Sequence, residues 1–509
     1  MKRTWPWLAV ITVFGGVLRI IGLGTTPLWL DESYTAQCSQ QILAEGVSAA
    51  ATCDHISPGY YLLAALASAV TGNSSEFTMR LFAMTAGVLT IPAMALLAKR
   101  MLGNDRVVVA VALATAGSPL VLRYSQEARG YSLLLLLGVC YIILNWDLAR
   151  KGPSLWRFVG IAFVAVGMIW LHLAALYLMV AAGLLMLWQL RITEWPLWAW
   201  AGVHLVAGLS YLPFAIETSK GLAGLVDNTL PGNPIPRLIF NTMAMVAGLS
   251  LGPTTGEVGS LGAKAAMAAN LPGLALIVSA LVGGLVSLWL LRRKVETTVW
   301  WWLLVLLVVP NLMLIVSVFQ SHVLMHLRYV ITTWPVYGLL IGFIWANAGR
   351  RHVIPLVSSL LLVAVYVVST ISYFADPKYA REDITQLPSV LAEQMDPGDV
   401  LLIANDNAVV PMLVYGLAEC PDNTINMRNV HAFDTLKATA RAEPGGDTFV
   451  VLYRQWENAP AETLNAFLDE TLAKPGQTWQ WQGVELQRRP GRLVAEDGDG
   501  LDHGCAYDK

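Results

Sequence analysis

Two adjacent carboxylates, Asp31 and Glu32, follow the first apolar segment of the chain, in the stretch Pro27-Leu28-Trp29-Leu30-Asp31-Glu32-Ser33-Tyr34. An acidic pair at the mouth of a membrane helix costs solvation free energy unless it is hydrated, paired or used in chemistry. A carboxylate here suits a general base that accepts a proton from an incoming hydroxyl or amine. Chain neighbours cannot both point at one spot, so we expect one to act and the other to hold a hydroxyl, a metal or a basic partner. A solvated loop pair is the alternative.

Other polar residues that could bind a substrate lie near the expected ends of further apolar runs. The candidates are His55, Tyr60, Arg123, Glu127, Arg129, Tyr131, His326, Arg328 and Tyr329. Arginine is costly at a membrane surface unless it is paired, and its planar guanidinium group matches the oxygens of a lipid phosphate. Histidine can bind a phosphate, a metal or a carboxylate. Snorkelling towards lipid headgroups is the alternative for the arginines, and local hydrogen bonding is the alternative for His55.

The composition is that of a multispanning membrane protein. The 509 residues are 56% hydrophobic and only 13% charged, with 19 Trp, which is too apolar for a soluble enzyme of this length. The formal net charge of -2 argues against nucleic acid as a partner. The sequence contains no P-loop, dinucleotide fingerprint, zinc-type Cys and His spacing or internal repeat.

Eleven membrane spans are expected from apolar runs of about 20 residues, the length that crosses the hydrocarbon layer. They lie at 5–22, 80–98, 107–122, 131–148, 157–190 (two spans that meet near His172), 196–216, 271–291, 299–319, 329–347 and 353–374. The apolar run 59–72 is short, and we assign it to a helix along the outer membrane interface. With this assignment the Lys and Arg clusters between spans all fall on the cytoplasmic side, as does the amino terminus.

The sequence therefore predicts two domains. Residues 1–375 form a membrane domain, whose first outer loop, 24–77, carries the acids and interfacial helices, and whose second long outer loop runs from 217 to about 270. Residues 376–509 form a soluble domain outside the membrane. Its expected strands are 400–404 and 449–453, and its expected helices are 383–395 and 461–473. The predicted fold class is an all-α polytopic membrane protein with a small C-terminal α/β periplasmic domain.

Four of the five cysteines lie in segments expected outside, and the fifth, Cys140, lies in an apolar run. Disulfides between Cys38 and Cys53 and between Cys420 and Cys505 would form in an oxidising compartment. Four unpaired thiols are the alternative, because connectivity does not follow from sequence.

The order of these motifs resembles the C-type (GT-C) glycosyltransferases, and within them the protein mannosyltransferase and aminoarabinose transferase superfamily of bacteria, glycosyltransferase family 39-like. The matching motifs are Leu-Asp-Glu at 30–32, His-x-x-Pro-x-Tyr-Tyr at 55–61, Arg80-Leu81, Ser118-Pro119 with the stretch 124–131, and Arg328-Tyr329. The soluble tail is not matched. One departure is that the Glu-Lys-Pro-Pro stretch of the aminoarabinose transferases finds only His55-Ile56-Ser57-Pro58 here, without the lysine.

This resemblance implies the GT-C fold in a bacterial inner membrane and an inverting transfer on its periplasmic face. A hexosyl or pentosyl group would pass from a polyprenyl-phosphate donor to an envelope acceptor, which could be a glycolipid, a polysaccharide or a protein. Asp31 would be the base, with Glu32 beside it, and Arg129 and Arg328 would hold the donor phosphate. Tyr329 and His55 would line the same cavity. The departure at His55 leaves open the sugar and a divalent metal ion at that place.

Two other functions fit the same residues. A polysaccharide polymerase or ligase would use diphosphate-linked oligosaccharides at the same face. A transporter of lipid-linked sugars fits less well, because transporters tend to show paired repeats and ionisable residues near the middle of the bilayer. Here the charges collect at one surface.

Overall fold

The computed structural model describes residues 4–54, 57–190, 194–224, 234–321, 326–349, 352–417, 419–429, 431–454, 461–498 and 500–504. The chain divides into two units. The helical unit consists of Met1–Leu23, Cys38–Gly252 and Pro272–Ala375, and the sheet unit consists of Gly24–Gln37, Pro253–Leu271 and Asp376–Lys509. Segments 24–37 and 253–271, which the sequence assigns to the membrane domain, thus group with the residues after 375. The placement of one domain in the membrane and the other in water stays a prediction.

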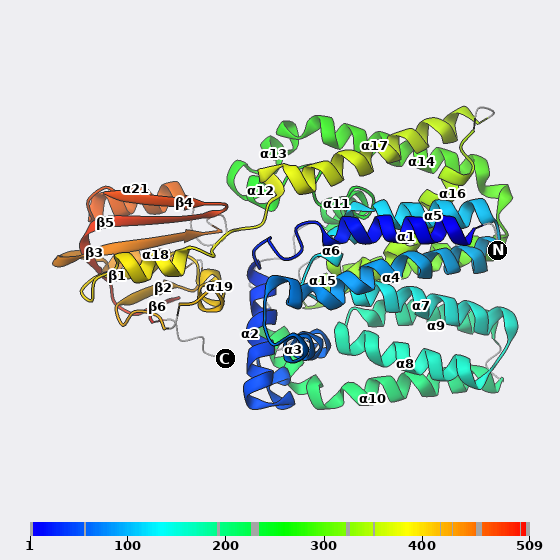
Figure 1. Ribbon diagram of the computed structural model, residues 1–509, viewed down its shortest axis with the longest axis horizontal. Helices are drawn as coiled ribbons and strands as arrows, with labels where there is room; N and C mark the ends of the chain where they lie inside the picture. Colours follow the sequence, from blue (N-terminus) through cyan, green and yellow to red (C-terminus); the bar gives the residue numbers. More distant parts are fainter. Residues whose placement is uncertain are drawn as a thin grey trace. The chain divides into compact units, whose positions relative to one another are not determined.

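The helical unit consists of α-helices and 3-10 helices, most of which are apolar. They are α1 (Trp5–Ile20), the second half of α2 (Leu30–Glu45), α3 (Gly59–Thr71), α4 (Glu76–Leu102), α5 (Asp105–Gly117), α6 (Pro119–Ser125), α7 (Tyr131–Lys151), α8 (Leu155–Leu171), α9 (Ala175–Gln189), α10 (Trp195–Gly224), α11 (Pro234–Ala247), α14 (Leu271–Leu291), α15 (Thr297–Ser321), α16 (Trp334–Ala346) and α17 (Val353–Ala375), with the 3-10 helices η1 (Val47–Ala51), η2 (Arg292–Lys294) and η3 (Leu327–Thr333). Within this unit α8 packs against both α7 and α10, and α4 packs against α1, α5 and α7 (Figure 1).

Polar caps and glycines set the ends of these helices. The Ser75 side chain accepts a hydrogen bond from the Thr78 N–H at the start of α4, and the helix ends at Gly103, whose φ of 69° disfavours other residues. The break between α5 and α6 follows from Ser118-Pro119, because proline has no N–H to continue the α5 hydrogen-bond ladder. The two helices meet at 55°.

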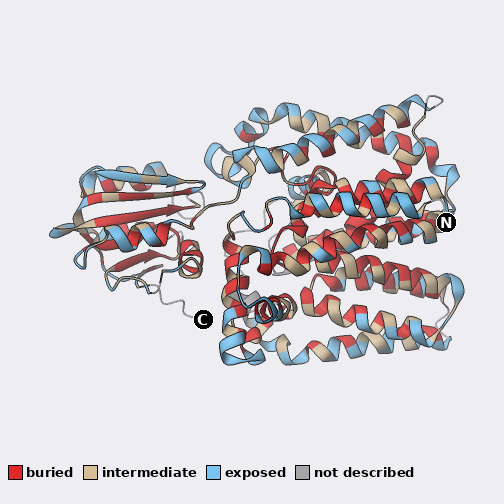
Figure 2. Ribbon diagram, in the orientation of Figure 1, coloured by how far each residue is buried: buried red, intermediate tan, exposed pale blue. Residues whose placement is uncertain are grey.

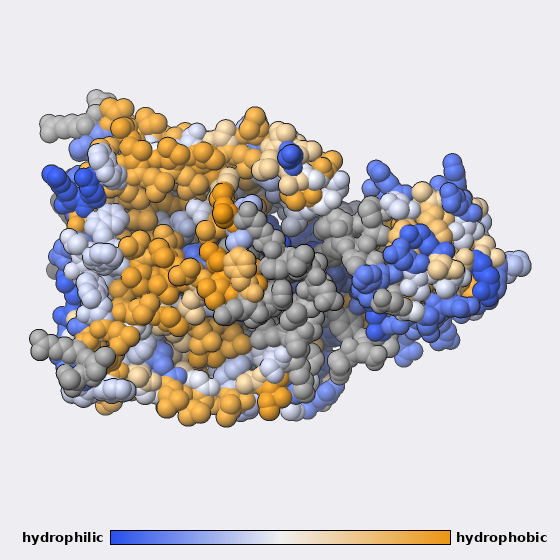
Figure 3. All heavy atoms as spheres, turned by 180° about the vertical axis from the view of Figure 1, so that it is seen from behind, coloured by the Kyte–Doolittle hydropathy of each residue, from blue (hydrophilic) through white to orange (hydrophobic). Residues whose placement is uncertain are grey.

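The helices agree with a multi-pass membrane protein. Within the described residues, 7 helices are long and apolar enough to cross a membrane, or 8 if the bent pair α5 and α6 is one span. Three further expected spans are the shorter apolar helices α1, α8 and α9, so the count of eleven stays a prediction. Figure 3 shows apolar side chains covering much of one face of the helical unit.

Two expectations about connections have different outcomes. The run 157–190 is two helices, α8 and α9, that meet near His172, as expected. The described part of the expected long outer loop from 217 to about 270 contains the helices α11, α12 (Thr255–Leu261) and α13 (Ala263–Ala269), and the position of this loop outside the membrane stays a prediction. In α12 a capping box of Thr254 and Glu257 satisfies the first backbone N–H groups, a signal that the apolar profile does not contain.

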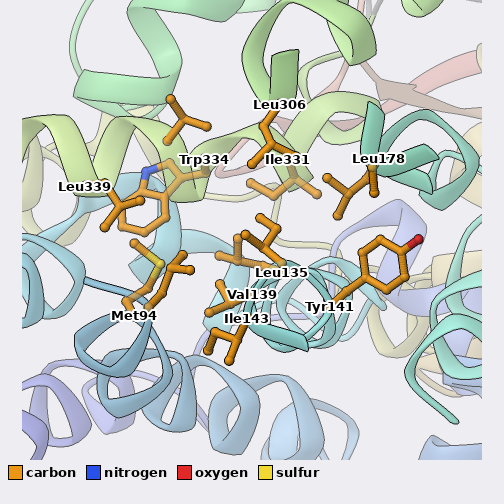
Figure 4. Packing of buried hydrophobic residues seen from close by; sticks show 14 of the residues in the cluster. Met94, Leu135, Val139, Tyr141, Ile143, Leu178, Leu306, Ile331, Trp334 and Leu339 are labelled. Carbon is orange, nitrogen blue, oxygen red and sulfur yellow. The ribbon is translucent and has the colours of Figure 1, made fainter. Parts of the chain in front are cut away.

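One apolar core joins the central helices. Met94 of α4, Val139 of α7, Leu178 of α9 and Trp334 of α16 belong to the same buried cluster (Figure 4). Helices α5 and α16 come very close together where Gly342 faces α5, since a Cβ atom at Gly342 would lie 2.7 Å from the backbone N and Cα of Val111. Small residues allow such close backbone approach between membrane helices.

The sheet unit contains a six-stranded mixed sheet with the strand order β4-β5-β3-β1-β2-β6. The strands are β1 (Val400–Ile403), β2 (Thr424–Met427), β3 (Arg441–Tyr453), β4 (Gln477–Trp481), β5 (Val484–Val494) and β6 (Leu501–His503), and the helices are α12, α13, α18 (Leu387–Gln394), α19 (Val409–Val414), α20 (Ala432–Thr439) and α21 (Ala461–Thr471), with the 3-10 helices η4 (Pro377–Tyr379) and η5 (Asp406–Ala408). Strand β1 pairs in parallel with β2 and β3, and the other pairs are antiparallel.

Helices cover both faces of this sheet. Leu402 packs in one cluster with residues of α20 and α21, whereas its neighbours Leu401 and Ile403 pack in another with α18 and α19. This alternation is the period of a strand, and it makes every residue of β1 buried (Figure 2). The expected α/β architecture of the tail is therefore confirmed.

The Cys38–Cys53 disulfide is formed, with the Cα atoms 5.5 Å apart. Cys420 is also disulfide-bonded, but Cys505, its expected partner, lies outside the described residues. Cys140 is a free thiol.

The close packing of α5 and α16 can be tested with a matched pair of substitutions. Gly342→Ala should lower the free energy of unfolding by about 1–3 kcal/mol, because a methyl group against backbone atoms forces the helices apart. Gly284→Ala, also at a buried helical glycine, should be nearly neutral, since its Cβ would meet only the Ile344 Cδ1 atom at 3.7 Å. Thermal unfolding of both variants in detergent measures the difference. Equal melting temperatures would contradict this account of the α5 and α16 contact.

Candidate active site

The short turn between α6 and α7, residues 126–130, carries the predicted site residues Glu127 and Arg129, and it is fixed to the end of α1. The Gln126 side-chain amide donates hydrogen bonds to the carbonyl groups of Arg19, at 3.1 Å, and Ile21, at 2.6 Å. The last carbonyl groups of a helix lack partners within the helix, so this amide satisfies them and places the turn at the same time.

Arg19, which the sequence analysis did not single out, binds the last residue of α6, just before this turn. Its guanidinium group is fully buried and donates to the Ser125 hydroxyl at 3.1 Å and to the carbonyl groups of Thr115 at 3.2 Å and Ala116 at 3.1 Å. These carbonyls lie at the end of α5, where Pro119 has interrupted the backbone ladder. The break between α5 and α6 is therefore stabilised by a cation from α1.

Arg129 is buried and held by two groups from the region around α3. Its guanidinium donates to the Tyr61 hydroxyl at 2.6 Å and forms an ion pair with Asp54 at 3.3 Å. Tyr61 in turn donates to Asp54. Burial raises the pKa of Tyr61 well above its ordinary value, so the phenol stays neutral and can donate. The adjacent Cys53 is tied to Cys38, which limits the movement of Asp54.

A second arginine lies among aromatic rings. The Arg328 guanidinium carbon is 5.9 Å from the ring centroid of Tyr131 and 5.7 Å from that of Tyr329. The His172 ring is 5.8 Å from Tyr131 and 5.3 Å from Tyr329, and His326 is 5.8 Å from Tyr329. We call Tyr131, His172, Arg328 and Tyr329 the arginine–tyrosine cluster. It unites the start of α7, the turn between α8 and α9, and η3.

His172 connects this cluster to Arg129. Burial lowers the pKa of His172 to about 3, and the positive charges of Arg328 and Arg129 act in the same direction. The chain beside Arg129 also packs against the residue before His172, since a Cβ atom at Gly130 would lie 3.3 Å from the Leu171 carbonyl oxygen. The Nδ1 atom of His172 accepts a hydrogen bond from the Ala174 N–H at 3.0 Å, so the neutral imidazole carries its proton on Nε2.

This arrangement is suited to an anion with several oxygens. Two guanidinium groups supply positive charge and parallel donors, and the tyrosine hydroxyls and the His172 Nε2–H supply neutral donors. In a partly buried site each of these contacts is stronger than in water. A phosphate group fits this chemistry in charge and in its number of acceptors.

The acidic pair lies in the first turn of α2, within the sheet unit. Glu32 is fully buried, accepts a hydrogen bond from the Trp29 N–H at 3.3 Å and forms an ion pair with Arg381. Asp31 is half-buried. Glu32 thus holds a basic partner, one of the roles expected for the second carboxylate, while Arg381 was not identified from sequence.

The remaining predicted residues are placed as follows. Tyr60 is buried, and its hydroxyl donates to the Met79 carbonyl at 2.8 Å. Glu127 is buried in the turn after α6, and Arg123 is half-buried in the last turn of that helix. His55 lies outside the described residues.

The structure thus brings Tyr131, His326, Arg328 and Tyr329 together, and Arg129 joins them through His172. The convergence of the acids with these residues stays a prediction, because Asp31 belongs to the sheet unit and Arg129 to the helical unit.

Three residues of this site were missed by sequence reasoning as binding groups: Asp54, Tyr61 and His172. His172 could have been identified from the sequence. It lies at the expected outer turn between two short spans, and therefore on the same side of the membrane as the candidate arginines. Tyr61 lies in the motif that carries the family resemblance.

Among the described residues, no group of three or more His, Cys, Asp or Glu side chains is placed to hold a metal ion.

Comparisons with known proteins address the fold. No family model matches the sequence, and no curated protein matches it by sequence. The structure is similar to that of ArnT, the aminoarabinose transferase of Cupriavidus metallidurans, in its apo state, with a TM-score of 0.53, 13% identity and coverage of 95% of this chain and 98% of that one. For the same protein bound to undecaprenyl phosphate, the TM-score is 0.50 at 14% identity, with the same coverage.

It is also similar to the apo oligosaccharyltransferase of Archaeoglobus fulgidus, with a TM-score of 0.54, 12% identity and coverage of 88% of this chain and 69% of that one. At these identities the likeness concerns the fold alone. The chain therefore has the GT-C fold that these two transferases share and that the sequence resemblance implies.

Proposed function

We propose that the protein is an inverting, membrane-embedded glycosyltransferase. It moves a monosaccharide, a hexosyl or pentosyl group, from a polyprenyl-phosphate donor to an envelope acceptor at the periplasmic face of a bacterial inner membrane. The observation that carries the proposal is that the charges of Arg129 and Arg328 both act on His172, with Gly130 packed against Leu171, in a chain with the GT-C fold. The solved structure of ArnT with undecaprenyl phosphate supports this donor class by analogy.

The donor accounts for the cationic site. A polyprenyl phosphate leaves as a stable anion, so the protein needs no acid to expel it, but it must stabilise the negative charge that develops on the phosphate oxygens. Arg129 and Arg328 take this role, with the rings of Tyr131 and Tyr329 in cation–π contact with the Arg328 guanidinium. The neutral His172 adds a donor that keeps its proton across physiological pH.

Asp31 is the proposed base. The acceptor hydroxyl or amine must lose a proton as it attacks the sugar carbon, and a carboxylate in hydrogen-bond reach can take it. Of the two adjacent acids, Glu32 binds Arg381 and the Trp29 N–H, and the resemblance to the C-type glycosyltransferases gives the base role to Asp31.

The Cys38–Cys53 disulfide supports an external site. Disulfides persist in oxidising compartments such as the bacterial periplasm, and this one lies in the segment between α1 and α4 that also contains Asp54 and Tyr61. The expected distribution of Lys and Arg places the same segment outside.

Transfer of a diphosphate-linked oligosaccharide is the second candidate, and the likeness to an oligosaccharyltransferase favours keeping it. The chain spans nearly all of ArnT but only 69% of that larger protein, which supports the monosaccharide donor. Thin-layer analysis of proteoliposomes supplied separately with polyprenyl-phosphate monosaccharides and polyprenyl-diphosphate oligosaccharides separates the two. We expect consumption of the first class. Consumption of only the second would replace this proposal by the polymerase or ligase function.

The base assignment predicts a large loss of turnover in Asp31→Asn. The amide keeps the size of the side chain but cannot accept the proton, so kcat should fall by at least about 100-fold while donor affinity is retained. Asp105→Asn is the matched control, since Asp105 also lies in the first turn of a helix, and it pairs with Lys99 away from the cluster. Single-turnover assays with purified protein give the comparison. Near-normal turnover in Asp31→Asn would remove Asp31 from the base role.

The phosphate site predicts that charge alone is not sufficient at position 328. Arg328→Lys keeps the charge but loses the planar fork and its stacking on the two tyrosines, so affinity for polyprenyl phosphate should weaken by about 10-fold or more. Arg150→Lys is the control, because Arg150 also stacks on an aromatic ring, that of Trp146, and also has a carboxylate partner, Glu296. Binding titrations with a fluorescent polyprenyl phosphate measure both. Equal affinities of the two variants would contradict the assignment of Arg328 to the phosphate site.

A further inference from the structure

The turn that carries Asp31 is held on both sides by residues from the C-terminal part of the chain. Three residues before Asp31, the Leu28 N–H donates to the Tyr415 hydroxyl at 2.7 Å. One residue after Asp31, Glu32 receives the guanidinium of Arg381. All of these residues belong to the sheet unit.

The second contact is a buried ion pair. The Glu32 side chain is 0% exposed and that of Arg381 only 7% exposed. Removal of one partner from such a pair leaves the other charge uncompensated in a medium of low dielectric constant, so the two groups hold each other in place. Glu32 also accepts the Trp29 N–H, the reciprocal half of a helix capping box, and thereby fixes the first turn of α2.

Arg381 is itself placed by its chain neighbours. Lys378 forms an ion pair with Glu257 of α12 at 3.0 Å, and Glu382 pairs with Arg454, which follows β3, at 3.5 Å. The next residue, Asp383, donates its N–H to the Gln482 carbonyl at 2.8 Å. The segment around Arg381 is therefore bound to α12, to the residue after β3 and to the turn between β4 and β5, so it can act as a fixed point for α2.

We propose that Arg381 is a positioning residue for Asp31, so that the C-terminal α/β domain is part of the catalytic machinery. This inference rests on the proposed function, in which Asp31 is the base. Proton transfer requires the carboxylate within hydrogen-bond reach of the acceptor, and a displacement of about 1 Å can cost about 100-fold in rate. The Glu32–Arg381 pair fixes the backbone of the neighbouring residue and thereby the starting point of the Asp31 side chain.

The experiment compares Arg381→Gln, Arg381→Lys and Glu32→Gln in the full-length protein, with kcat and donor affinity measured separately. Arg381→Gln and Glu32→Gln should each lower kcat by about 10-fold or more at unchanged affinity for polyprenyl phosphate, because the phosphate site does not involve them. Arg381→Lys, which keeps a cation for Glu32, should recover part of the loss. Arg489→Gln is the stability control, since Arg489 is equally buried in the sheet unit and pairs with Asp469 on α21.

Two outcomes decide the proposal. In an Asp31→Asn background, Arg381→Gln should change the residual turnover by less than about 2-fold, because a positioning residue has nothing left to position. Folded Arg381→Gln protein with normal kcat, or a loss no larger than that of an equally destabilised Arg489→Gln protein, would overturn it. Full activity of Asp31→Asn would instead refute the base assignment, so the two failures are distinguishable.

Discussion

A guanidinium group taken out of water must be met by acceptors, and this constraint organises the molecule. Arg19 is met by carbonyl groups at a helix break, Arg129 by Asp54 and Tyr61, and Arg381 by Glu32. Each pairing joins segments far apart in sequence, separated by 97, 75 and 349 residues. Because an uncompensated buried charge is so unfavourable, loss of either partner would destabilise the fold, and each of these contacts therefore fixes a position in it.

The same constraint separates the charges with a structural partner in the fold from those to which we assign a role in the proposed reaction. In the acidic pair, the buried Glu32 forms an ion pair with Arg381 and accepts the Trp29 N–H at the start of α2, whereas Asp31 is half-buried. Among the arginines, Arg19 binds the carbonyl groups at the helix break, whereas the charges of Arg129 and Arg328 both act on the neutral His172. The proposed function assigns the proton acceptor to Asp31 and the phosphate site to Arg129 and Arg328, the two parts that an inverting transfer from a lipid phosphate requires.

Local signals in the sequence were sufficient for most elements. Apolar runs predicted the long helices, the short run at Gly59 predicted α3, and the continuous apolar run around Leu402 predicted a strand. Contacts between residues far apart in the sequence could not be predicted. The residue types of Glu32 and Arg381, for example, do not indicate that these two side chains form an ion pair. Arg19 was a missed signal, because an arginine inside an apolar first span calls for a buried partner. The helices α11, α12 and α13 were not assigned, because each is shorter than the apolar run that a membrane span needs.

The most direct test of the account is a cryo-electron microscopy structure of the protein in lipid nanodiscs with a polyprenyl-phosphate monosaccharide bound. We expect the phosphate oxygens within hydrogen-bond distance of the Arg129 and Arg328 guanidinium groups, with the Asp31 carboxylate facing the side of the sugar carbon opposite the phosphate. A phosphate bound away from both arginines, or Asp31 turned away from the sugar, would contradict the central claim.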